Sequence, residues 1–251
     1  MITDPKKRFS NRVAYYIKYR PTYPPAVIDY LRQEINFSPT WVIADVGSGT
    51  GILAEIFLQR DNLVFGVEPN QAMRLAAEDL LLAYPNFRSI DGSAEATALA
   101  AGSIDLVTAG QAFHWFDPAQ AKVEFSRILK PGGRVVLVWN TRRVDATPLM
   151  RAYEQLLDTY AEDYRRVKHT RVDRNILGTF FNGYRAKAFG NSQYVDYETL
   201  KGRLLSSSYA PMTGHPQHAP MITALCQIFD QYQVDGRVRF EYDTNLFYGY
   251  V

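Results

Sequence analysis

The sequence predicts an α/β fold, a doubly wound sheet of mostly parallel strands with helices on both faces. Continuous apolar runs at 41–46, 63–67, 104–109 and 134–139 alternate with segments of helical character. This alternation is typical of a parallel sheet that is buried on both faces. The first run also ends in a glycine-rich loop that opens a helix, as in sheets that bind ligands at the carboxyl ends of their strands. Right-handed crossovers then give the doubly wound arrangement.

The helices expected between these strands follow from spacing and composition. Segment 52–60 repeats apolar residues every three or four positions, and segment 71–83 is rich in Ala, Leu and Glu. Segment 118–129 has the same helical spacing and ends at Lys-Pro-Gly-Gly, which stops a helix. A weaker strand fits 87–90.

The pattern changes after residue 140. We expect helices at 147–166, 197–206 and 217–233, a strand at 184–195, and an edge or antiparallel strand in the alternating C-terminal stretch. No linker is visible, so we expect one domain over 1–251. Its parts would be an N-terminal lid and helix (1–36), a cofactor-binding core (41–140), and a substrate lid with terminal antiparallel strands (141–251).

Composition restricts the class of protein. With 251 residues, 47% hydrophobic and 22% charged, the chain has enough apolar material for a full core. A net charge of +2 argues against a large nucleic-acid surface, and the absence of about 18 consecutive apolar residues predicts no membrane span. The single cysteine and the lack of an apolar leader favour a cytoplasmic location. We expect no metal site.

The loop Gly47-Ser48-Gly49-Thr50-Gly51 indicates a ligand. Glycines let the backbone approach a ligand without a Cβ in the way, at the positive end of a helix; a loop can also be glycine-rich merely to turn tightly. The dinucleotide fingerprint needs Gly-x-Gly-x-x-Gly, but here Ile52 stands at the third glycine position, which disfavours NAD. Glu68 ends the second strand 21 residues past Gly47, where an acid can accept hydrogen bonds from ribose hydroxyls. Alternatively, Glu68 caps the next helix.

Further segments extend the pattern. After the third strand, "DGSAEATAL" places Ser93 and Ala94 where they could meet an adenine edge, and "AGSIDLVTAGQAFHWF" and "ILKPGGRVVLVWN" cover strands four and five. In order and spacing across 42–140, the chain resembles the class I S-adenosylmethionine-dependent methyltransferases. More narrowly, "YRPTYP", "AFHWFD" and "SSSYAP" resemble the small-molecule branch with the trans-aconitate methyltransferase-like and cantharidin-resistance-like enzymes.

The resemblance implies a seven-stranded Rossmann-like sheet in the order 3-2-1-4-5-7-6, with strand seven antiparallel, and S-adenosyl-L-methionine as cofactor. It places the methionine part against the glycine loop, the ribose on Glu68 and the adenine between Pro69 and Met73. Asp45 would orient the loop or reach the amino group through water. Many members hold the adenine amino group with an acid, but this chain has Ser93, so the Ala94 backbone or Glu95 would serve instead. The cofactor residues implied are Asp45, Gly47, Ser48, Gly49, Gly51, Glu68, Pro69, Met73, Ser93, Ala94, Glu95 and Gln111.

The aromatic turn after strand four is expected to wall the methyl-transfer pocket. Phe113, His114 and Trp115 are large rings in a turn, and aromatic faces tolerate a sulfonium and exclude water. His114 could be a general base, a hydrogen-bond donor to an anionic acceptor, or a structural contact of the loop. Trp115 is expected to be a pocket wall, whereas Phe113 could simply belong to the core.

Two lids are expected over the site. In the first, Arg20 could pair with the cofactor carboxylate and Tyr19 could stack above it; the alternative is a leader that packs on the sheet edge. In the second, which spans 142–215, Arg142 is the best candidate to bind a carboxylate because it follows strand five directly. Ser207, Ser208 and Tyr209 are the next candidates for acceptor binding.

The function expected is methylation of a small molecule, with O-methylation of a carboxylate or hydroxyl favoured. A carboxylate is already nucleophilic, which fits the absence of an obvious catalytic dyad. C-methylation of a lipophilic ring, cofactor binding without transfer and a dinucleotide oxidoreductase remain alternatives. The acceptor and the oligomeric state are left open.

Overall fold

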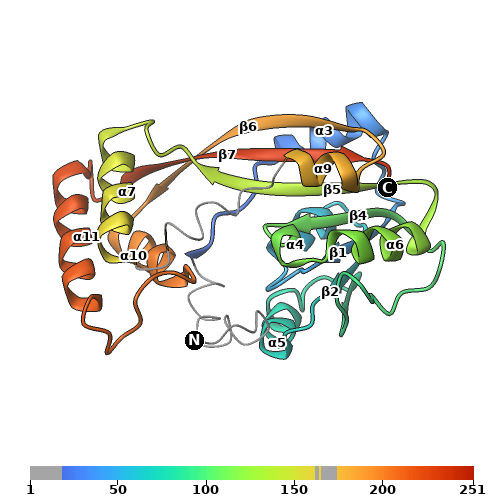
Figure 1. The fold of residues 1–251 in the computed structure, drawn as a ribbon, viewed down its shortest axis with the longest axis horizontal. Coiled ribbons are helices and arrows are strands. Elements are labelled where there is room, and N and C mark those ends of the chain that lie inside the picture. The colour runs from blue at the N-terminus through green and yellow to red at the C-terminus, as the bar shows by residue number, and fades with distance from the viewer. Residues whose placement is uncertain (1–18, 162–163, 165–173) are drawn as a thin grey trace.

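Seven strands form one mixed sheet in the order β3-β2-β1-β4-β5-β7-β6 (Figure 1). The computed structural model describes residues 19–161, 164 and 174–251, so 1–18 of the expected first lid and most of 162–173 in the second lie outside the described residues. β7 runs antiparallel to both β5 and β6, and the other neighbouring pairs are parallel. The expected strand order, fold class and antiparallel seventh strand are confirmed.

The elements are close to those expected. The strands are β1 (Val42–Val46), β2 (Leu63–Val67), β3 (Phe87–Ile90), β4 (Ile104–Gly110), β5 (Leu129–Arg142), β6 (Tyr184–Val195) and β7 (Val238–Gly249). The described helices are α3 (Ala26–Ile35), α4 (Ile52–Leu58), α5 (Gln71–Leu80), α6 (Pro118–Ile128), α7 (Pro148–Tyr160), α9 (Arg174–Phe180), α10 (Tyr197–Ser206), α11 (His218–Tyr232) and the 3-10 turn η2 (Phe113–Trp115). The sequence did not predict α9 and η2.

β5 is longer than the apolar run that predicted it. The helix α6 does end at Ile128, as Lys-Pro-Gly-Gly predicts, but the chain enters the strand at once. Leu129 pairs with Ile104 and Arg134 with Leu106, with a shift of register between them. An irregularity of this kind lets extra residues bulge from one strand while the ladder continues.

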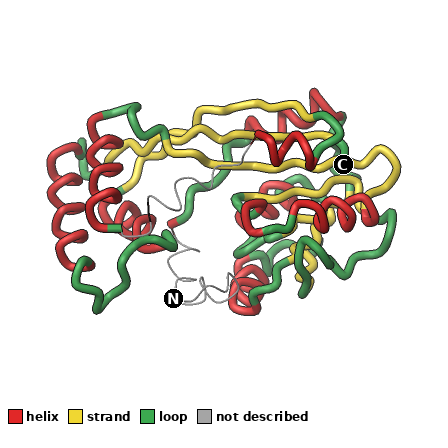
Figure 2. Tube along the Cα trace, in the orientation of Figure 1, coloured by secondary structure: helices red, strands yellow, loops and turns green. Residues whose placement is uncertain are grey.

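Alternation along the strands divides the core between two faces of the sheet. In β1, Ile43 faces one cluster, which includes Phe57 of α4, while Ala44 and Val46 face another, which includes Phe125 of α6. Successive side chains of a strand point to opposite faces, so a strand with both faces covered must be apolar throughout. This is why the central strands read as continuous apolar runs. Figure 2 shows helices around the strands of this core.

β5, β6 and β7 continue beyond the parallel core to a group of helices, α7, α10 and α11 (Figure 1). We call this group the helical lobe. A third cluster, with Met150, Leu204, Leu225 and Phe240, holds the lobe together. The long antiparallel strands therefore connect two packed regions.

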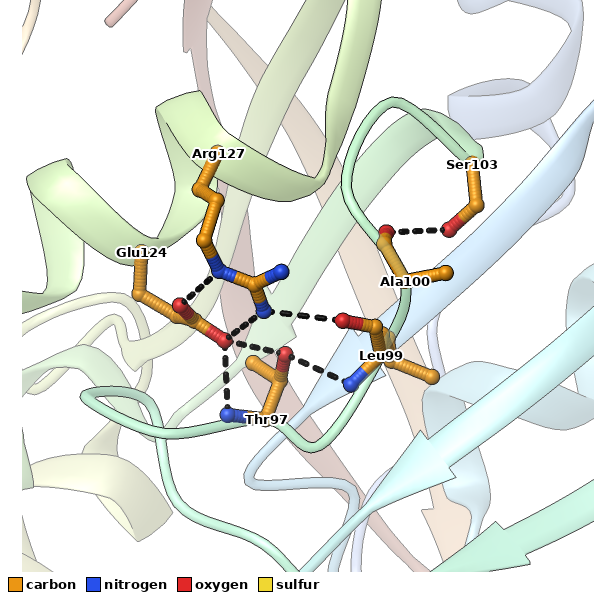
Figure 3. A network of polar contacts seen from close by, with 6 residues as sticks. All are labelled: Thr97, Leu99, Ala100, Ser103, Glu124 and Arg127. Carbon is orange, nitrogen blue, oxygen red and sulfur yellow. Dashed lines mark hydrogen bonds and ion pairs between the residues drawn. The ribbon is translucent and has the colours of Figure 1, made fainter.

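A polar network fixes the loop after β3 to α6 (Figure 3). The buried carboxylate of Glu124 accepts hydrogen bonds from Thr97 N at 2.9 Å and Thr97 Oγ1 at 2.6 Å. Arg127 donates to both oxygens of Glu124 at 2.7 Å and also to the Leu99 carbonyl at 2.8 Å. These charge-assisted contacts hold the loop that leads from the candidate adenine residues into β4.

No helix in the described part of the chain has the length and apolar character needed to cross a membrane. The described residues also contain no group of three His, Cys, Asp or Glu side chains placed to hold a metal ion.

Candidate functional site

The glycine loop between β1 and α4 has the backbone that its sequence suggests. Gly47, Gly49 and Gly51 have φ angles of 66°, 57° and 86°, in the left-handed region that favours glycine. Gly47 N and Ser48 N both donate to the Val67 carbonyl, at 2.8 and 3.2 Å. A Cβ added to Gly47 would lie 2.6 Å from the Cβ of Ala112, so the loop packs tightly against the turn after β4.

Glu68 joins this loop to the start of α5. One of its carboxylate oxygens accepts from Gly49 N at 3.0 Å and the other from Asn70 N at 2.9 Å. Burial raises the pKa of this carboxyl, although both hydrogen bonds oppose the shift. Each oxygen has a second lone pair, so ribose hydroxyls could still donate to it. Pro69 is half-buried and Met73 buried beside it, and the roles of all three in binding a cofactor remain predictions.

Asp45 is a buried carboxyl that lacks a full set of donors. Its Oδ1 accepts from Thr108 Oγ1 at 2.9 Å, whereas its Oδ2 is buried and has no hydrogen-bond partner. Burial raises the pKa of Asp45 to about 7, and the negative charge of Glu68 adds to the shift. Asp45, Gly47, Ser48 and other residues line a small cavity of about 30 Å³. A donor such as an ammonium group or a water molecule would satisfy Oδ2 there.

The candidate adenine residues form a tight turn after β3. Ser93 N donates to the Ala96 carbonyl at 3.0 Å, and Ala96 N donates back to Ser93 at 3.3 Å. Ala94 between them is buried. The Glu95 carboxylate accepts from Asp117 N at 2.9 Å and is thereby fixed near the start of α6. The turn lies where sequence placed it, and adenine recognition by it remains a prediction.

Phe113 belongs to the core, which is the role that the sequence left open. Only 3% of its surface is exposed, and its ring centroid lies 4.7 Å from that of Phe180 in α9. Phe113 is not among the described residues that line either cavity. Its packing against α9 anchors the aromatic turn to the core.

His114 lies between two indoles. Its ring centroid is 4.5 Å from that of Trp115 and 5.4 Å from that of Trp139 in β5. Desolvation by the surrounding protein lowers the pKa of His114 to about 4, and the positive charge of Arg20 contributes. The imidazole is therefore neutral at physiological pH, although part of the residue is exposed to solvent. His114 and Trp115 are not among the described lining residues of either cavity, but their neighbour Trp139 lines the larger one, and their roles remain predictions.

A larger cavity of about 540 Å³ lies among β5, β7, α7, α10 and the segment around residue 20. Its described lining contains no Asp or Glu. It contains four arginines, Arg20, Arg142, Arg174 and Arg203, and four tyrosines, Tyr153, Tyr164, Tyr209 and Tyr242. A cavity with this lining attracts anions.

The two cavities share part of their walls. Arg20, Pro21, Gln111 and Asn140 line both of them. Gln111, in the left-handed region at φ 57°, donates through Nε2 to the Asn140 carbonyl at 3.3 Å and accepts from Asn140 N at 2.9 Å. This pair joins the ends of β4 and the parallel part of β5 at the common wall.

The segment that begins at residue 19 reaches the helical lobe and β6. Arg20 donates to the Ser206 carbonyl at 3.1 Å, and the Thr22 carbonyl accepts from Asn191 Nδ2 at 2.9 Å. The Tyr19 ring packs against Gly202 of α10 and is not among the described lining residues of either cavity. Arg20 thus lies at the shared wall, and its pairing with a cofactor carboxylate and the stacking of Tyr19 on a cofactor remain predictions.

Arg142 lies in the larger cavity but is already engaged. It donates to Tyr209 Oη at 2.9 Å and to Tyr164 Oη at 2.5 Å, and its Nη2 is 3.3 Å from a carboxylate oxygen of Glu154. Tyr209 therefore lines the cavity with Arg142, and the binding of an acceptor by these two residues remains a prediction. Ser208 is not among the described lining residues, whereas its neighbours Ser206 and Ser207 are.

Sequence reasoning missed several cavity residues, namely Tyr153, Tyr164, Arg174, Arg203 and Tyr242. They come from separate helices and from β7. Only the antiparallel pairing of β5 with β7, which places Arg142 opposite Tyr242, brings the distant segments together. An alternating strand and an amphipathic helix gave no sign of which polar residues would point inward.

Comparison with known proteins identifies the family. Residues 44–137 match the model of a methyltransferase domain. An uncharacterized methyltransferase-like protein of Schizosaccharomyces pombe is 32% identical over 204 residues, which are 81% of this chain and 78% of that protein. An uncharacterized methyltransferase of Mycobacterium tuberculosis is 39% identical over 139 residues, 55% of this chain and 54% of the relative. The chain thus spans about half the length of the mycobacterial relatives that it matches.

Solved structures agree with this family in fold. A proposed type II methyltransferase from Anaeromyxobacter dehalogenans has a TM-score of 0.67 at 21% identity, and the match covers 92% of this chain and 98% of the other. The YcgJ protein of a Bacillus species has a TM-score of 0.54 at 19% identity, with 89% and 97% covered. The chain belongs to the class I methyltransferase family, and S-adenosyl-L-methionine is its cofactor.

Proposed function

We propose that this protein transfers the methyl group of S-adenosyl-L-methionine to an oxygen of an anionic small molecule, most directly a carboxylate. The observation that carries the proposal is the larger cavity, which has four arginines and no acid in its described lining. This cavity shares Arg20, Gln111 and Asn140 with the cavity beside the glycine loop. An acceptor in the one cavity would lie next to a methyl donor at the other.

The described residues fit the cofactor. Asp45 Oδ2 is a buried acceptor without a donor, and Asp45, Gly47 and Ser48 line the small cavity together. Asp45 would hold the amino-acid end, the glycine loop would lie along the methionine part, and Glu68 would accept from the ribose. The cofactor supplies an activated methyl group on a sulfonium, with a good leaving group. The protein has to hold the two reactants in line and exclude water.

The charge of the larger cavity supports a carboxylate acceptor. A carboxylate is ionised at neutral pH, so no residue needs to remove a proton before its oxygen attacks the methyl carbon. The arginines raise the local concentration of anions and orient them by hydrogen bonds. His114, with its lowered pKa, is a neutral imidazole beside Trp139 of the cavity wall and adds no charge there. Such a polar lining is a poor match for a lipophilic ring as the acceptor.

A hydroxyl acceptor is a second candidate, and one observation favours it. Tyr209 accepts a hydrogen bond from Arg142, so its own hydrogen must point elsewhere. Burial raises the pKa of Tyr209, but the charge of Arg142 and hydrogen bonds from Ser207 and Arg142 outweigh burial, and the pKa is lowered overall. A phenol of this kind could accept the proton of a hydroxyl nucleophile.

The test is methyl transfer from labelled cofactor into a small-molecule extract fractionated by anion exchange. We expect a labelled product from an anionic fraction, identified by mass spectrometry as a methyl ester. Mild alkaline hydrolysis releases labelled methanol from an ester but not from an ether or a C-methyl product. A Glu68→Ala variant serves as the control for cofactor dependence. A base-stable product from a neutral fraction would contradict the carboxylate proposal, and no product from any fraction would indicate binding without transfer.

A further inference from the structure

Arg203 is a buried cation with an unusual set of partners. It lies in α10 with 9% of its surface exposed and lines the larger cavity. Its Nε donates to the Tyr19 carbonyl at 3.0 Å, and its Nη2 donates to Gln193 Oε1. Its Nη1 is buried and has no hydrogen-bond partner. All its partners are neutral, and in the described part of the chain Arg203 forms no ion pair.

Arg142 is a second arginine of this cavity, and it differs from Arg203 in having a charged partner. Arg142 lines the same cavity, but it is 3.3 Å from the Glu154 carboxylate and donates to two phenol oxygens. Its charge is compensated within the protein. Buried charges are normally paired, because desolvation of a lone ion is strongly unfavourable. Arg203 departs from this rule in a cavity whose described lining has no acid.

The rings beside Arg203 relieve its charge only in part. Its guanidinium carbon lies 5.8 Å from the ring centroid of Phe240 and 5.9 Å from that of Tyr242. At these distances, near the limit of cation–π contact, the attraction is weak. The Tyr242 hydroxyl forms no hydrogen bond with the described residues, so it remains available as a donor beside the guanidinium.

We propose that Arg203 is the residue that binds the anionic group of the acceptor, a carboxylate or a phosphate, through Nη1, with Tyr242 as a second donor. The proposal rests on the proposed function for the identity of the ligand as the methyl acceptor. Carboxylate and phosphate share the chemistry that a guanidinium recognises. Arg142, with its charge already balanced, shapes the cavity and holds Tyr209 in place.

A purely structural role for Arg203 predicts a different behaviour. If its function were to tie Tyr19 and Gln193 to α10, removing it would destabilise the protein regardless of any anion. If Arg203 serves to bind a ligand, its uncompensated charge destabilises the folded protein when no ligand is bound. Replacing a buried charge by an apolar side chain of similar size is often neutral or stabilising. The sign of the stability change therefore separates the two roles.

The experiment measures anion binding to the full chain saturated with S-adenosylhomocysteine. Succinate and inorganic phosphate are the probes, and calorimetry follows their affinity in the wild type and in R203M, R203K and R143M. We expect R203M to weaken binding of the preferred anion at least tenfold, with S-adenosylhomocysteine affinity within twofold of wild type. R203K should recover part of the loss. R143M is the matched control, because Arg143 directly follows the cavity-lining strand β5 but is not among the described lining residues, and its side chain is 48% exposed and 3.8 Å from Asp243. R143M should bind the anions like wild type.

Urea unfolding without anions completes the test. R203M should be at least as stable as wild type. The proposal is overturned if R203M binds both anions like wild type, or if R203M is less stable and R203K restores stability without restoring anion affinity. A preference for succinate indicates a carboxylate acceptor, and a preference for phosphate a phosphorylated one.

Failure of the proposed function would look different from failure of this inference. Anion binding that depends on Arg203, without methyl transfer to any acceptor, leaves Arg203 as an anion-binding residue and removes the transferase. Methyl transfer at equal rates by wild type and R203M retains the transferase and removes Arg203 from its acceptor site.

Discussion

Replacing Asp45 by Asn should change stability and cofactor binding in opposite directions. In the protein without ligand, Asp45 Oδ2 is buried without a donor and the carboxyl has a pKa of about 7. Asn removes the charge, keeps the shape and can still contact Thr108 Oγ1. We therefore expect D45N to stabilise the protein without ligand at alkaline pH. We also expect it to weaken binding of S-adenosylhomocysteine, whose ammonium group would be the missing donor.

The size of the stability effect follows from the pKa. A rise from 3.8 to about 7 is roughly three units, and each unit corresponds to about 1.36 kcal/mol, so the full penalty is about 4 kcal/mol. The folded state binds the Asp45 proton more tightly than the unfolded state. The penalty is therefore absent below pH 3.8, grows as the pH rises and is complete above pH 7. Between pH 5 and pH 8, the advantage of D45N over wild type should grow by roughly 3 kcal/mol.

Urea denaturation of both proteins at pH 5 and pH 8 measures this difference, and calorimetry at pH 8 measures S-adenosylhomocysteine affinity. A Thr108→Val variant is a useful control, because it removes the one hydrogen bond that Asp45 accepts from a side chain and should raise the pKa further. If wild type and D45N show the same dependence on pH, Asp45 is not a strained carboxyl. If D45N also binds S-adenosylhomocysteine like wild type, Asp45 has no part in the cofactor site.

Three further predictions concern other parts of the site. Glu68→Ala should weaken S-adenosylhomocysteine binding by about 1.5–3 kcal/mol, the usual worth of hydrogen bonds to a charged group; unchanged affinity in calorimetry would remove Glu68 from the site. With the pKa of His114 near 4, the methyl-transfer rate should show no titration of His114 between pH 6 and 8. Trp115→Ala should reduce the rate of methyl transfer more than it reduces cofactor affinity. A kinetic pKa near 6.5 that disappears in His114→Ala would refute the neutral imidazole. Glu124 has a pKa lowered to about 2, chiefly by its hydrogen bond from Arg127, so its stabilising effect is present above pH 4.5 and is lost as the pH falls toward 2. Glu124→Gln should lower the free energy of unfolding by about 1–2 kcal/mol at pH 7, measured with urea, and a loss that persists unchanged at pH 2 would contradict this origin.

The parallel core was predictable because its signals are local. A strand covered on both faces must be apolar at every position, and β2 and β3 begin and end where the sequence placed them. The 3-10 turn η2 and helix α9 were not predictable in this way. α9 contains Gly178 and Thr179, which are poor helix formers, and it is held by packing of Phe180 on Phe113. Tertiary contact, not local propensity, determines this helix.

The candidate site likewise contains residues that local sequence indicates and residues that only tertiary packing brings into place. The glycine loop and Glu68 could be proposed from the sequence because each directly follows a strand. Arg142 was chosen for the same reason, yet its charge is balanced by Glu154. Arg203 follows Lys201 in a helix and reads as an ordinary surface cation. Its burial arises from packing of α10 against β7, and no pattern in α10 alone reports that contact.

The antiparallel β7 brings residues of the proposed acceptor cavity next to the cofactor-binding core. Along β5, Arg142 inside the larger cavity stands two positions beyond Asn140, which lies at the wall shared by both cavities, a distance of about 6.6 Å at the usual rise of a strand. β7 pairs with this stretch so that Thr244 lies opposite Asn140 and Tyr242 opposite Arg142. The same strand then continues to Phe240, against which Arg203 packs. The cavity residues on β7 and α10, which we propose bind the acceptor, can therefore change without any change in the glycine loop, so the same core would serve acceptors of different chemistry.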